Sequence, residues 1–514
     1  MTREHAQDRE RAVSLDLPEG ELRELSETFR RAALELMSEP EALPVFPETS
    51  AEATARLFRL PLPAEGVGLS ALSEDFRRVV SNVRQNNHPR MFGYVASPAA
   101  PAAVFGDWVA SALNSNVTSW RSAPAAAEVE RTVVGWLAEM IGYGGGGGRD
   151  CGGLLTSGGS MANMIALFVA HRWQLRAAGV GSAGAHDVSR EGLWGAGAPM
   201  TIYASDQVHL SIPKAADVLG FGRAHVRVVP SGDDFRMDVR ALAERVEADK
   251  AAGLRPFCVV ASAGTVATGA VDPLAEVARV ARERSLWFHV DGAYGALARS
   301  DASKSALFEG LEEADSVSLD PHKWLYAPLD CGCLLMRDPA RARAAFEGTE
   351  EGYIRVFERE ADEAFAFWDY GVELSRPFRA LKVWALLRYY GARRVAACIA
   401  EDNRLAAHMG ELVREAEDFE LMAPVTLGIC CFRYVPAEWG REPGENSDAR
   451  LDELNARVMH RVQRGGEAYV SNAVLRGRFA LRASVTNFRT TRRDLRLTLD
   501  VIRRAARECL NEGA

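Results

Sequence analysis

Residues 318–328 read SLDPHKWLYAP, and they overlap the end of a run, ADSVSLD at 314–320, in which small and apolar residues alternate as in a buried strand. Lys323 stands just past the end of this predicted strand, directly after His322. Desolvating an ammonium group costs several kcal/mol unless a neighbouring group compensates for it. The stretch therefore predicts a strand that ends in a functional lysine.

Size and composition exclude several kinds of protein. A chain of 514 residues is long enough for two or three domains. Its net charge of -9 argues against a nucleic-acid partner, because phosphate binding needs a basic surface. The sequence has no apolar run of about 18 residues, and its start, MTREHAQDRERAV, is too charged for a secretory signal, so we expect a cytoplasmic protein without a membrane partner. Its 8 cysteines form no C-x-x-C pair, which favours reduced thiols and no metal site.

The sequence divides into three regions. An N-terminal segment, 1–105, contains an amphipathic helix but too few apolar runs for a core, and it is expected to pack on another surface such as a partner subunit. Region 106–385 alternates strands with helices, which is typical of an α/β domain with a mostly parallel sheet. Region 386–514 is predicted to be a smaller α+β domain. The predicted strands of the middle region are GGLLTS, MTIYAS, AHVRVVP, PFCVVASAG, LWFHVDGAYG, DSVSLD and CGCLLMRD.

Polar residues follow several of these strands, at the sheet edge where α/β proteins bind ligands. Asp291 closes an apolar strand and needs a cationic or hydrogen-bonding partner there. Gly158, Gly159 and Ser160 join a strand to a helix, and this turn can cradle an anion or serve only as a tight connection. A phosphate cradle, a carboxylate and a lysine together fit pyridoxal 5'-phosphate. Its phosphate would lie on the turn, its ring nitrogen at Asp291, and its aldehyde on Lys323 as a Schiff base.

Four motifs, NNHPRMFGYVASPA (86–99), TSGGSMAN (156–163), HVDGAYG (289–295) and DPHKW (320–324), resemble those of the pyridoxal-phosphate-dependent group II amino acid decarboxylases. This family includes the aromatic amino acid, glutamate and diaminobutyrate decarboxylases, and the resemblance covers roughly residues 70 to 500. It implies the architecture called fold type I, with a large domain built on a seven-stranded sheet and a small C-terminal domain. It also implies a homodimer with its active site at the interface, where the N-terminal helices wrap the second subunit.

The resemblance also implies roles for individual residues. Lys323 corresponds to the Schiff-base lysine, Asp291 to the carboxylate at the ring nitrogen, and His209 to the histidine that stacks over the ring. His209 could instead be a surface histidine, and Asp291 could simply pair with an arginine. Asp272 is expected to cap the helix that follows it. The other implied cofactor contacts are Gly158, Gly159, Ser160, Thr265, Ala293 beneath the ring, Asp320 and His322, with Val266 where many relatives have a second threonine.

Decarboxylation of an L-amino acid to an amine and carbon dioxide is the activity that the resemblance implies. Relatives protonate the product with a tyrosine on a loop of the neighbouring subunit. An ungapped count back from ELSRPFRALKVW puts that position at Phe367, which has no exchangeable proton, although Tyr353 or Tyr370 could serve instead. A phenylalanine there accompanies oxygen-dependent deamination to an aldehyde in relatives, so this reaction is the alternative.

The substrate is less constrained by the sequence. The resemblance implies that Ser97, Asn116 and Thr118 line the pocket, and such a polar wall favours a smaller or more polar amino acid than an indole or catechol substrate. Arg482 and Arg121 could bind an acidic group or form ordinary ion pairs. A carbon-sulfur lyase would need a loop cysteine, whereas Cys331 and Cys333 fall on a predicted strand. A scaffold without a cofactor is the remaining class.

Overall fold

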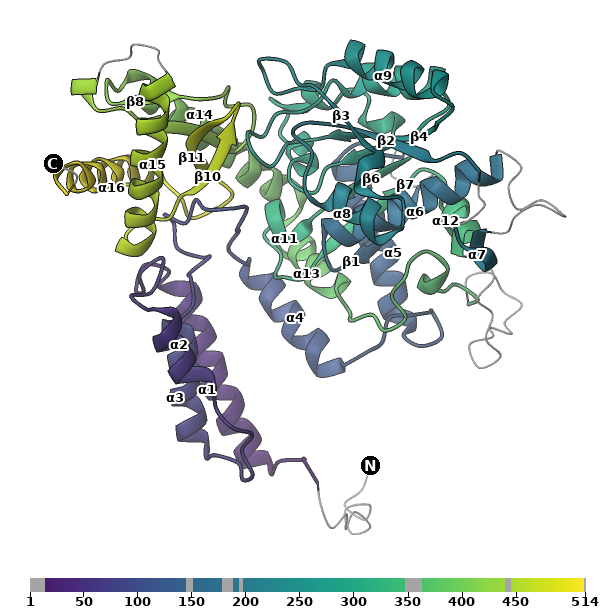
Figure 1. Ribbon diagram of the computed structural model, residues 1–514. Helices are drawn as coiled ribbons and strands as arrows, with labels where there is room; N and C mark the ends of the chain where they lie inside the picture. Colours follow the sequence, from purple (N-terminus) through teal and green to yellow (C-terminus); the bar gives the residue numbers. More distant parts are fainter. Residues whose placement is uncertain are drawn as a thin grey trace, which may run out of the picture.

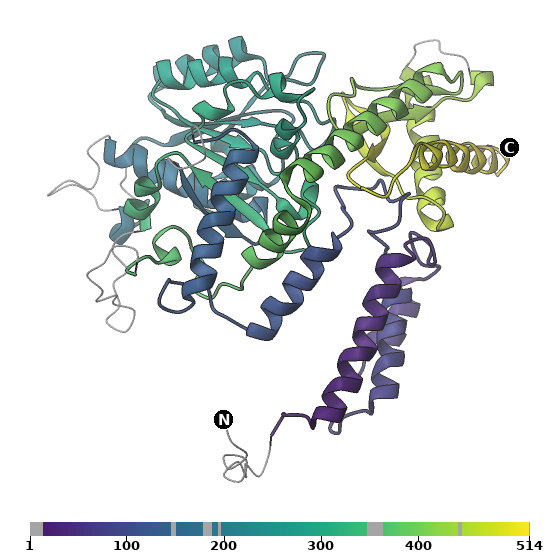
Figure 2. The same cartoon turned by 180° about the vertical axis from the view of Figure 1, so that it is seen from behind.

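The computed structural model describes residues 14–144, 151–177, 188–193, 197–346, 363–439 and 445–512. Figure 1 shows a large domain, a smaller C-terminal domain beside it, and N-terminal helices that extend away from both. The view from behind shows the same separation of these helices from the large domain (Figure 2). The arrangement agrees with the predicted α/β architecture and its small C-terminal domain.

A seven-stranded sheet forms the centre of the large domain, as predicted, in the order β1-β7-β6-β5-β4-β2-β3. Strands β2 to β6 pair in parallel, whereas β7 is antiparallel to both of its neighbours. The strands are β1 (Gly152–Thr156), β2 (Met200–Ser205), β3 (Val226–Val229), β4 (Arg255–Ser262), β5 (Trp287–Asp291), β6 (Ser316–Leu319) and β7 (Gly332–Met336).

Helices cover this sheet and explain why its strands are apolar throughout. Every residue of β2, β5, β6 and β7 is buried, as expected for strands covered on both faces. Helix α6 packs against β1 and β4 to β7, whereas α9 and α10 pack near the other edge, on β3, β4 and β5. The helices of this domain are α5 (Pro124–Met140), α6 (Gly159–Ala177), α7 (Val188–Glu191), α8 (Ser211–Val218), α9 (Val239–Ala251), α10 (Leu274–Glu283), α11 (Pro321–Trp324) and α12 (Pro339–Phe346).

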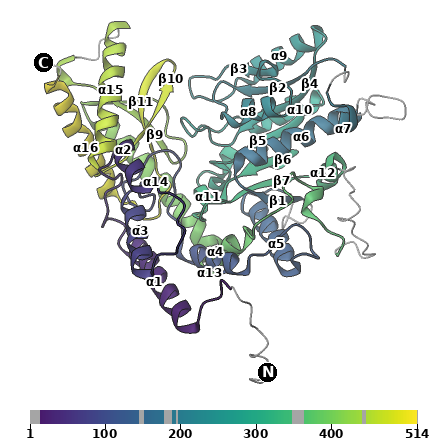
Figure 3. The same ribbon diagram turned by 60° about the horizontal axis from the view of Figure 1, so that its bottom comes forward.

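The C-terminal domain has an antiparallel four-stranded sheet in the order β10-β11-β9-β8. Its second and separate core forms where α14, α15 and α16 pack on these strands. Figure 3 shows this sheet and its helices standing apart from the large sheet. The elements are α14 (Ala392–Glu415), β8 (Phe419–Leu421), β9 (Ile429–Tyr434), α15 (Glu445–Gly465), β10 (Ser471–Leu475), β11 (Arg478–Ser484) and α16 (Arg492–Asn511).

The N-terminal helices are α1 (Glu19–Ser38), α2 (Ala51–Phe58) and α3 (Leu69–Ser81), and none of them contains a buried residue. Contacts such as that between Phe29 and Phe76, whose ring centroids lie 4.5 Å apart, hold α1 against α3. We call these three helices the N-terminal arm. They are amphipathic, as predicted for α1, but their apolar faces have little to pack on within this chain.

Both predicted domain boundaries fall inside helices. The boundary at 105/106 lies in α4 (Pro101–Leu113), and that at 385/386 lies in α13 (Ala380–Tyr390). These two helices pack against each other, so they bridge the regions that the sequence separates. The exact boundaries remain predictions. Across the described residues, every helix is too short or too polar to cross a bilayer.

Candidate active site

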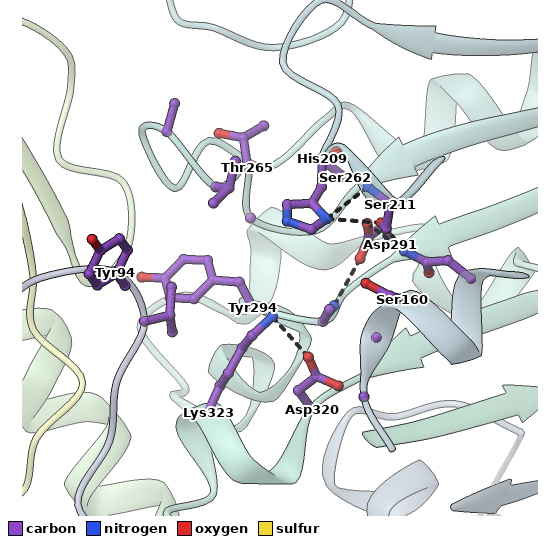
Figure 4. Close-up of a pocket in the computed structure, with 18 of the residues that line it drawn as sticks. Tyr94, Ser160, His209, Ser211, Ser262, Thr265, Asp291, Tyr294, Asp320 and Lys323 are labelled. Carbon is purple, nitrogen blue, oxygen red and sulfur yellow. Dashed lines mark hydrogen bonds and ion pairs between the residues drawn. The ribbon is translucent and has the colours of Figure 1, made fainter. Parts of the chain in front are cut away.

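A cavity of about 730 Å³ opens where the strands of the large sheet end. Segments that follow β1, β2, β4, β5 and β6 contribute to its wall, which is the edge at which parallel sheets bind ligands. The C-terminal domain adds Ser471 to Val474 and Arg482, and the stretch before α4 adds Tyr94 and Val95. Figure 4 shows side chains from these elements converging on one space. The cavity thus combines residues from distant parts of the sequence.

Lys323 projects into this cavity from α11, the single helical turn that follows β6. Pro321 starts the turn and Trp324 anchors its far side, and both are buried. The Nζ atom of Lys323 lies 2.8 Å from Oδ2 of Asp320, whose other carboxylate oxygen has no hydrogen-bond partner in the described part of the chain. The structure thus places the predicted functional lysine beside a compensating carboxylate, in an accessible space.

Asp291 ends β5 and is held by three donors. The amide nitrogen of Asn163 lies 2.9 Å from Oδ2, and Ser318 Oγ and the backbone nitrogen of Ala293 each lie 3.2 Å from Oδ1. Asp291 is only 7 % exposed and lines the cavity. Asp291 is therefore a carboxylate held in place by hydrogen bonds from three donors.

The turn between β1 and α6 comes close to both of these groups. A Cβ atom on Gly159 would lie 2.7 Å from Cβ of Ala293 and 3.0 Å from an oxygen of Asp320. Only glycine therefore lets this turn approach so closely. Helix α6 begins at Gly159, and the first N–H groups of a helix lack intrahelical partners and attract anions. Gly158, Gly159 and Ser160 line the cavity.

His209 lies between β2 and α8, and Nδ1 of its ring is 2.9 Å from Ser211 Oγ and 3.2 Å from the backbone nitrogen of Ser211. Burial lowers the pKa of His209. The carboxylates of Asp291 and Asp320 act in the opposite direction, and Lys323 adds to the lowering. The ring is therefore mostly neutral near pH 7 and lines the cavity above Asp291 (Figure 4).

Thr265, Ala293 and His322 also line the cavity, as their predicted roles require. Thr265 Oγ1 lies 3.0 Å from Thr268 Oγ1, so a threonine three positions later, rather than residue 266, supplies the second hydroxyl of this loop. The prediction for Asp272 is wrong, because Pro273 occupies the N-cap of α10. The carboxylate of Asp272 instead accepts from the backbone nitrogens of Met237 and Ser262, each at 2.7 Å.

Arg482 reaches the cavity from β11. Its Nε and Nη1 atoms donate to the backbone oxygens of Val266 and Tyr94, at 2.9 and 2.7 Å. Its Nη2 atom is buried without a hydrogen-bond partner among the described residues. Burial lowers the pKa of Arg482. Arg482 therefore places a guanidinium group in the wall of the cavity.

Among the described residues, the predicted substrate residues other than Arg482 do not line the cavity of their own chain. Ser97 donates to the backbone oxygen of Lys323, and Asn116 accepts from the backbone nitrogen of Arg376 at 2.8 Å. Thr118 accepts through its backbone from Phe367, and the Phe367 side chain is 1 % exposed in its own core. Tyr353 lies outside the described residues. The structure therefore separates this group from Arg482.

Several residues of the site were missed by reasoning from the sequence. Ser318 is the partner of Asp291 in the register between β5 and β6, a pairing that the alternation of each strand could have suggested. Asn163 lies one turn after Gly159, on the helix face toward the sheet. Ser211, Tyr94 and Tyr294 carry no comparable signal, because only the fold brings them to the cavity.

Comparisons with known proteins give consistent results. Residues 52–435 match the model of the pyridoxal-dependent decarboxylase conserved domain. The chain is 33% identical over 432 residues to an aromatic-L-amino-acid decarboxylase of Bacillus atrophaeus, covering 84% of each chain. It is 33% identical to tryptophan decarboxylase 1 of Oryza sativa subsp. japonica, over 92% of this chain and 91% of that one. A phenylacetaldehyde synthase of Petunia hybrida is 29% identical over 81% of this chain and 82% of the relative.

Solved structures agree with these relatives. The crystal structure of Oryza sativa TDC with PLP and tryptamine superposes with a TM-score of 0.87 at 31% identity, covering 96% of this chain and 99% of that one. The crystal structure of mouse CSAD superposes with a TM-score of 0.86 at 26% identity, covering 94% and 98%. Both likenesses extend over nearly the whole of each chain, including the N-terminal region and the C-terminal domain.

Proposed function

Because the chain belongs to the pyridoxal-dependent decarboxylase family, we propose that it decarboxylates an aromatic L-amino acid to the corresponding amine and carbon dioxide. The protein is a pyridoxal-phosphate-dependent amino acid decarboxylase by family, and the proposal concerns its substrate class and product. The observation that carries it is the convergence of Lys323, Asp291 and His209 on one cavity at the sheet edge. The names of the relatives support the aromatic substrate.

The residues of the cavity fit pyridoxal 5'-phosphate. Lys323 supplies the amine for its aldehyde, Asp291 a carboxylate for its ring nitrogen, and the Gly159 turn a helix start for its phosphate. When bound, this cofactor supplies a conjugated ring that accepts the electron pair of the bond broken at the substrate's Cα. The donors around Asp291 hold its carboxylate in the cavity wall, where it would pair with the ring nitrogen, and the small side chain of Ala293 lines the same cavity.

Two cationic or donor groups are suited to the substrate. We assign Arg482, which lines the cavity, to the substrate's carboxylate, since a guanidinium group forms strong hydrogen bonds with carboxylates. His209 lies across the cavity from Lys323 and can hold a proton close to the reacting atoms. The neutral state of its ring favours donation through hydrogen bonds over permanent charge.

A homodimer with the site at its interface fits the surface of this chain. The N-terminal arm has no buried residue, and Asn116 is exposed, so a second subunit would cover both. In that assembly Asn116 and its neighbours would approach the partner's cavity rather than their own. This placement would reconcile their predicted role with their distance from the cavity of the same chain.

Oxygen-dependent deamination to an aldehyde is the second candidate. The phenylacetaldehyde synthase of Petunia hybrida among the relatives favours it. Phe367, the residue that suggested it, is 1 % exposed within its own chain, and its part in the reaction stays a prediction. The preference for a small polar substrate now depends on the proposed dimer, because the residues behind it lie outside the cavity of their own chain.

The test is a screen of the twenty L-amino acids with the purified, cofactor-loaded protein, recording carbon dioxide and oxygen in the same vessel. We expect carbon dioxide and an amine from aromatic amino acids without consumption of oxygen. Equal consumption of oxygen with release of an aldehyde would establish the second candidate instead. Release of carbon dioxide from no amino acid would overturn both.

A further inference from the structure

Asn163 makes contacts in three directions from the buried face of α6. It is 1 % exposed, and its amide nitrogen lies 2.9 Å from Asp291 Oδ2 and 2.9 Å from Ser211 Oγ. Its amide oxygen lies 2.9 Å from His289 Nε2. A carboxylate only accepts hydrogen bonds, so the NH₂ group must face Asp291 and the orientation of the amide is fixed. Both hydrogens and the oxygen of this side chain are therefore used.

The contact with His289 fixes the direction of the hydrogen bonds behind Asn163. Because the amide oxygen accepts, Nε2 of His289 must donate. Burial lowers the pKa of His289 to about 4, so its ring is neutral and Nδ1 accepts from Ser316 Oγ at 2.9 Å. Trp287 Nε1 donates to the same hydroxyl oxygen, also at 2.9 Å, which leaves the hydroxyl proton for His289. The hydrogen bonds therefore all run in one direction, from Trp287 through Ser316 and His289 to Asn163 at the cavity.

The contact with Ser211 continues this direction to His209. Asn163 donates to Ser211 Oγ, which leaves the hydroxyl proton of Ser211 for His209 Nδ1. The backbone N–H of Ser211, which can only donate, also points at Nδ1. Nδ1 therefore carries no proton, and neutral His209 holds its proton on Nε2, the nitrogen that remains available to the cavity.

We propose that Asn163 is a positioning residue that joins the carboxylate serving the ring nitrogen to the histidine over the ring, and holds that histidine as an Nε2–H donor. The inference rests on the proposed function, because it assigns Asp291 and His209 to the same bound cofactor. One amide thereby orients two groups that never contact each other directly. The Asp291 branch acts on cofactor affinity, and the Ser211 branch acts on the proton of His209.

The test compares Asn163→Leu, which removes all three contacts at similar volume, with Ser211→Ala, which cuts only the branch to His209. The first readout is the dissociation constant of pyridoxal 5'-phosphate by equilibrium dialysis. The second is the titration midpoint of His209 in the cofactor-free full chain, followed by NMR after ¹⁵N-histidine labelling and assigned by the signal lost in His209→Gln. We expect Asn163→Leu to weaken cofactor binding about tenfold, the usual size of a lost hydrogen bond to a charged group. Both variants should raise the His209 midpoint by about one pH unit.

Asn403→Leu is the matched control, since Asn403 is 3 % exposed on α14 and donates to Asp301 at 2.9 Å, and neither residue lines the cavity. It should change neither readout. Unchanged values in Asn163→Leu, or an equal loss of cofactor affinity in Ser211→Ala, would overturn the proposal. If Asn163→Leu does not fold, an unchanged midpoint in Ser211→Ala is decisive against it. Failure of the wild-type chain to bind the cofactor would instead count against the proposed function, because the midpoint is read without cofactor.

Discussion

The cavity wall and the N-terminal arm differ in where their side chains find partners. Asp291 and Asn163 are almost fully buried, and both are hydrogen-bonded to other described residues of the same chain. In the arm, no residue of α1, α2 or α3 is buried, and leucines such as Leu22 and Leu57 remain 54% and 40% exposed. The cavity groups thus find partners within the chain, whereas the apolar surface of the arm stays uncovered, as the proposed dimer requires. Substitutions in the two regions should therefore have separable effects.

Lys323→Ala should have the largest effect on activity and no effect on assembly. Loss of the amine removes covalent attachment, so decarboxylation should fall at least about 10⁴-fold, as when a catalytic nucleophile is deleted. Borohydride should no longer fix a pyridoxyl group to the protein, as read by mass spectrometry. The molar mass from light scattering should equal that of the wild type. Lys304→Ala, a partly exposed lysine outside the cavity, controls for loss of a positive charge. A change of mass in Lys323→Ala would break the separation of the two regions.

Asp291→Asn should act in the same region with a smaller effect. It keeps the shape of the side chain but removes the charge toward which three donors are directed, so we expect the decarboxylation rate to fall about 10²- to 10³-fold. Ser318→Ala removes only one of these donors and should cost about tenfold or less. Steady-state rates at saturating cofactor measure both. Equal losses in the two variants would indicate that the charge itself contributes little.

Charges placed in the arm should change assembly first. Leu57→Glu combined with Val79→Glu puts carboxylates on the exposed apolar surface of α2 and α3, where the wild-type side chains are 40% and 44% exposed. We expect the dissociation constant of the dimer to rise at least about tenfold, because a buried unpaired charge is costly. Light scattering over a dilution series measures it. Val228→Glu, on an exposed apolar side chain of β3, is the control. An unchanged mass for the arm variant would contradict the proposed covering of the arm.

The fold was largely predictable because each strand of the large sheet is a short apolar run closed by polar residues or glycine. The C-terminal sheet was harder to predict. Strand β10 alternates buried and exposed residues, and it ends in a tight turn whose two residues, Arg476 and Gly477, both have positive φ angles of 52° and 80°. An arginine gives no warning of such a turn, so the sequence does not predict the strand at Ser471–Leu475.

The sequence could predict only those site residues whose side-chain chemistry is recognisable without knowing their neighbours in space. Lys323, Asp291 and His209 follow strands, so the topology brings them to one edge. Phe367 was assigned by counting along a loop, and counting cannot show that the cation of Arg376 lies 4.1 Å from its ring centroid and helps bury it. Asn163 was missed because its role depends on distances between elements, which the sequence does not encode locally.

Asp402, on α14, is a second buried carboxyl group, and it contacts the residue that follows Lys323. It accepts from Trp324 Nε1 at 2.9 Å and from Tyr326 at 2.7 Å, and Trp324 stacks on Tyr294 with ring centroids 5.0 Å apart. Burial raises the pKa of Asp402 to about 7, and the hydrogen bonds from Tyr326 and Trp324 only partly oppose this. This carboxyl group is therefore protonated in the folded protein at mildly acidic pH.

Because the folded protein binds this proton more tightly than the unfolded chain, the contribution of Asp402 to stability is fully present below the unfolded pKa and is lost as pH rises toward 7. Asp402→Asn imitates the protonated group and cannot titrate. The free energy of unfolding of Asp402→Asn minus that of the wild type should therefore increase by about 2 kcal/mol from pH 5 to pH 8. Urea unfolding at both pH values measures this difference, with Asp233→Asn, on a side chain that is 99% exposed, as the control. If the difference in free energy of unfolding did not change with pH, Asp402 would be ionised throughout this range. The buried surroundings of Asp402 would then tolerate a negative charge.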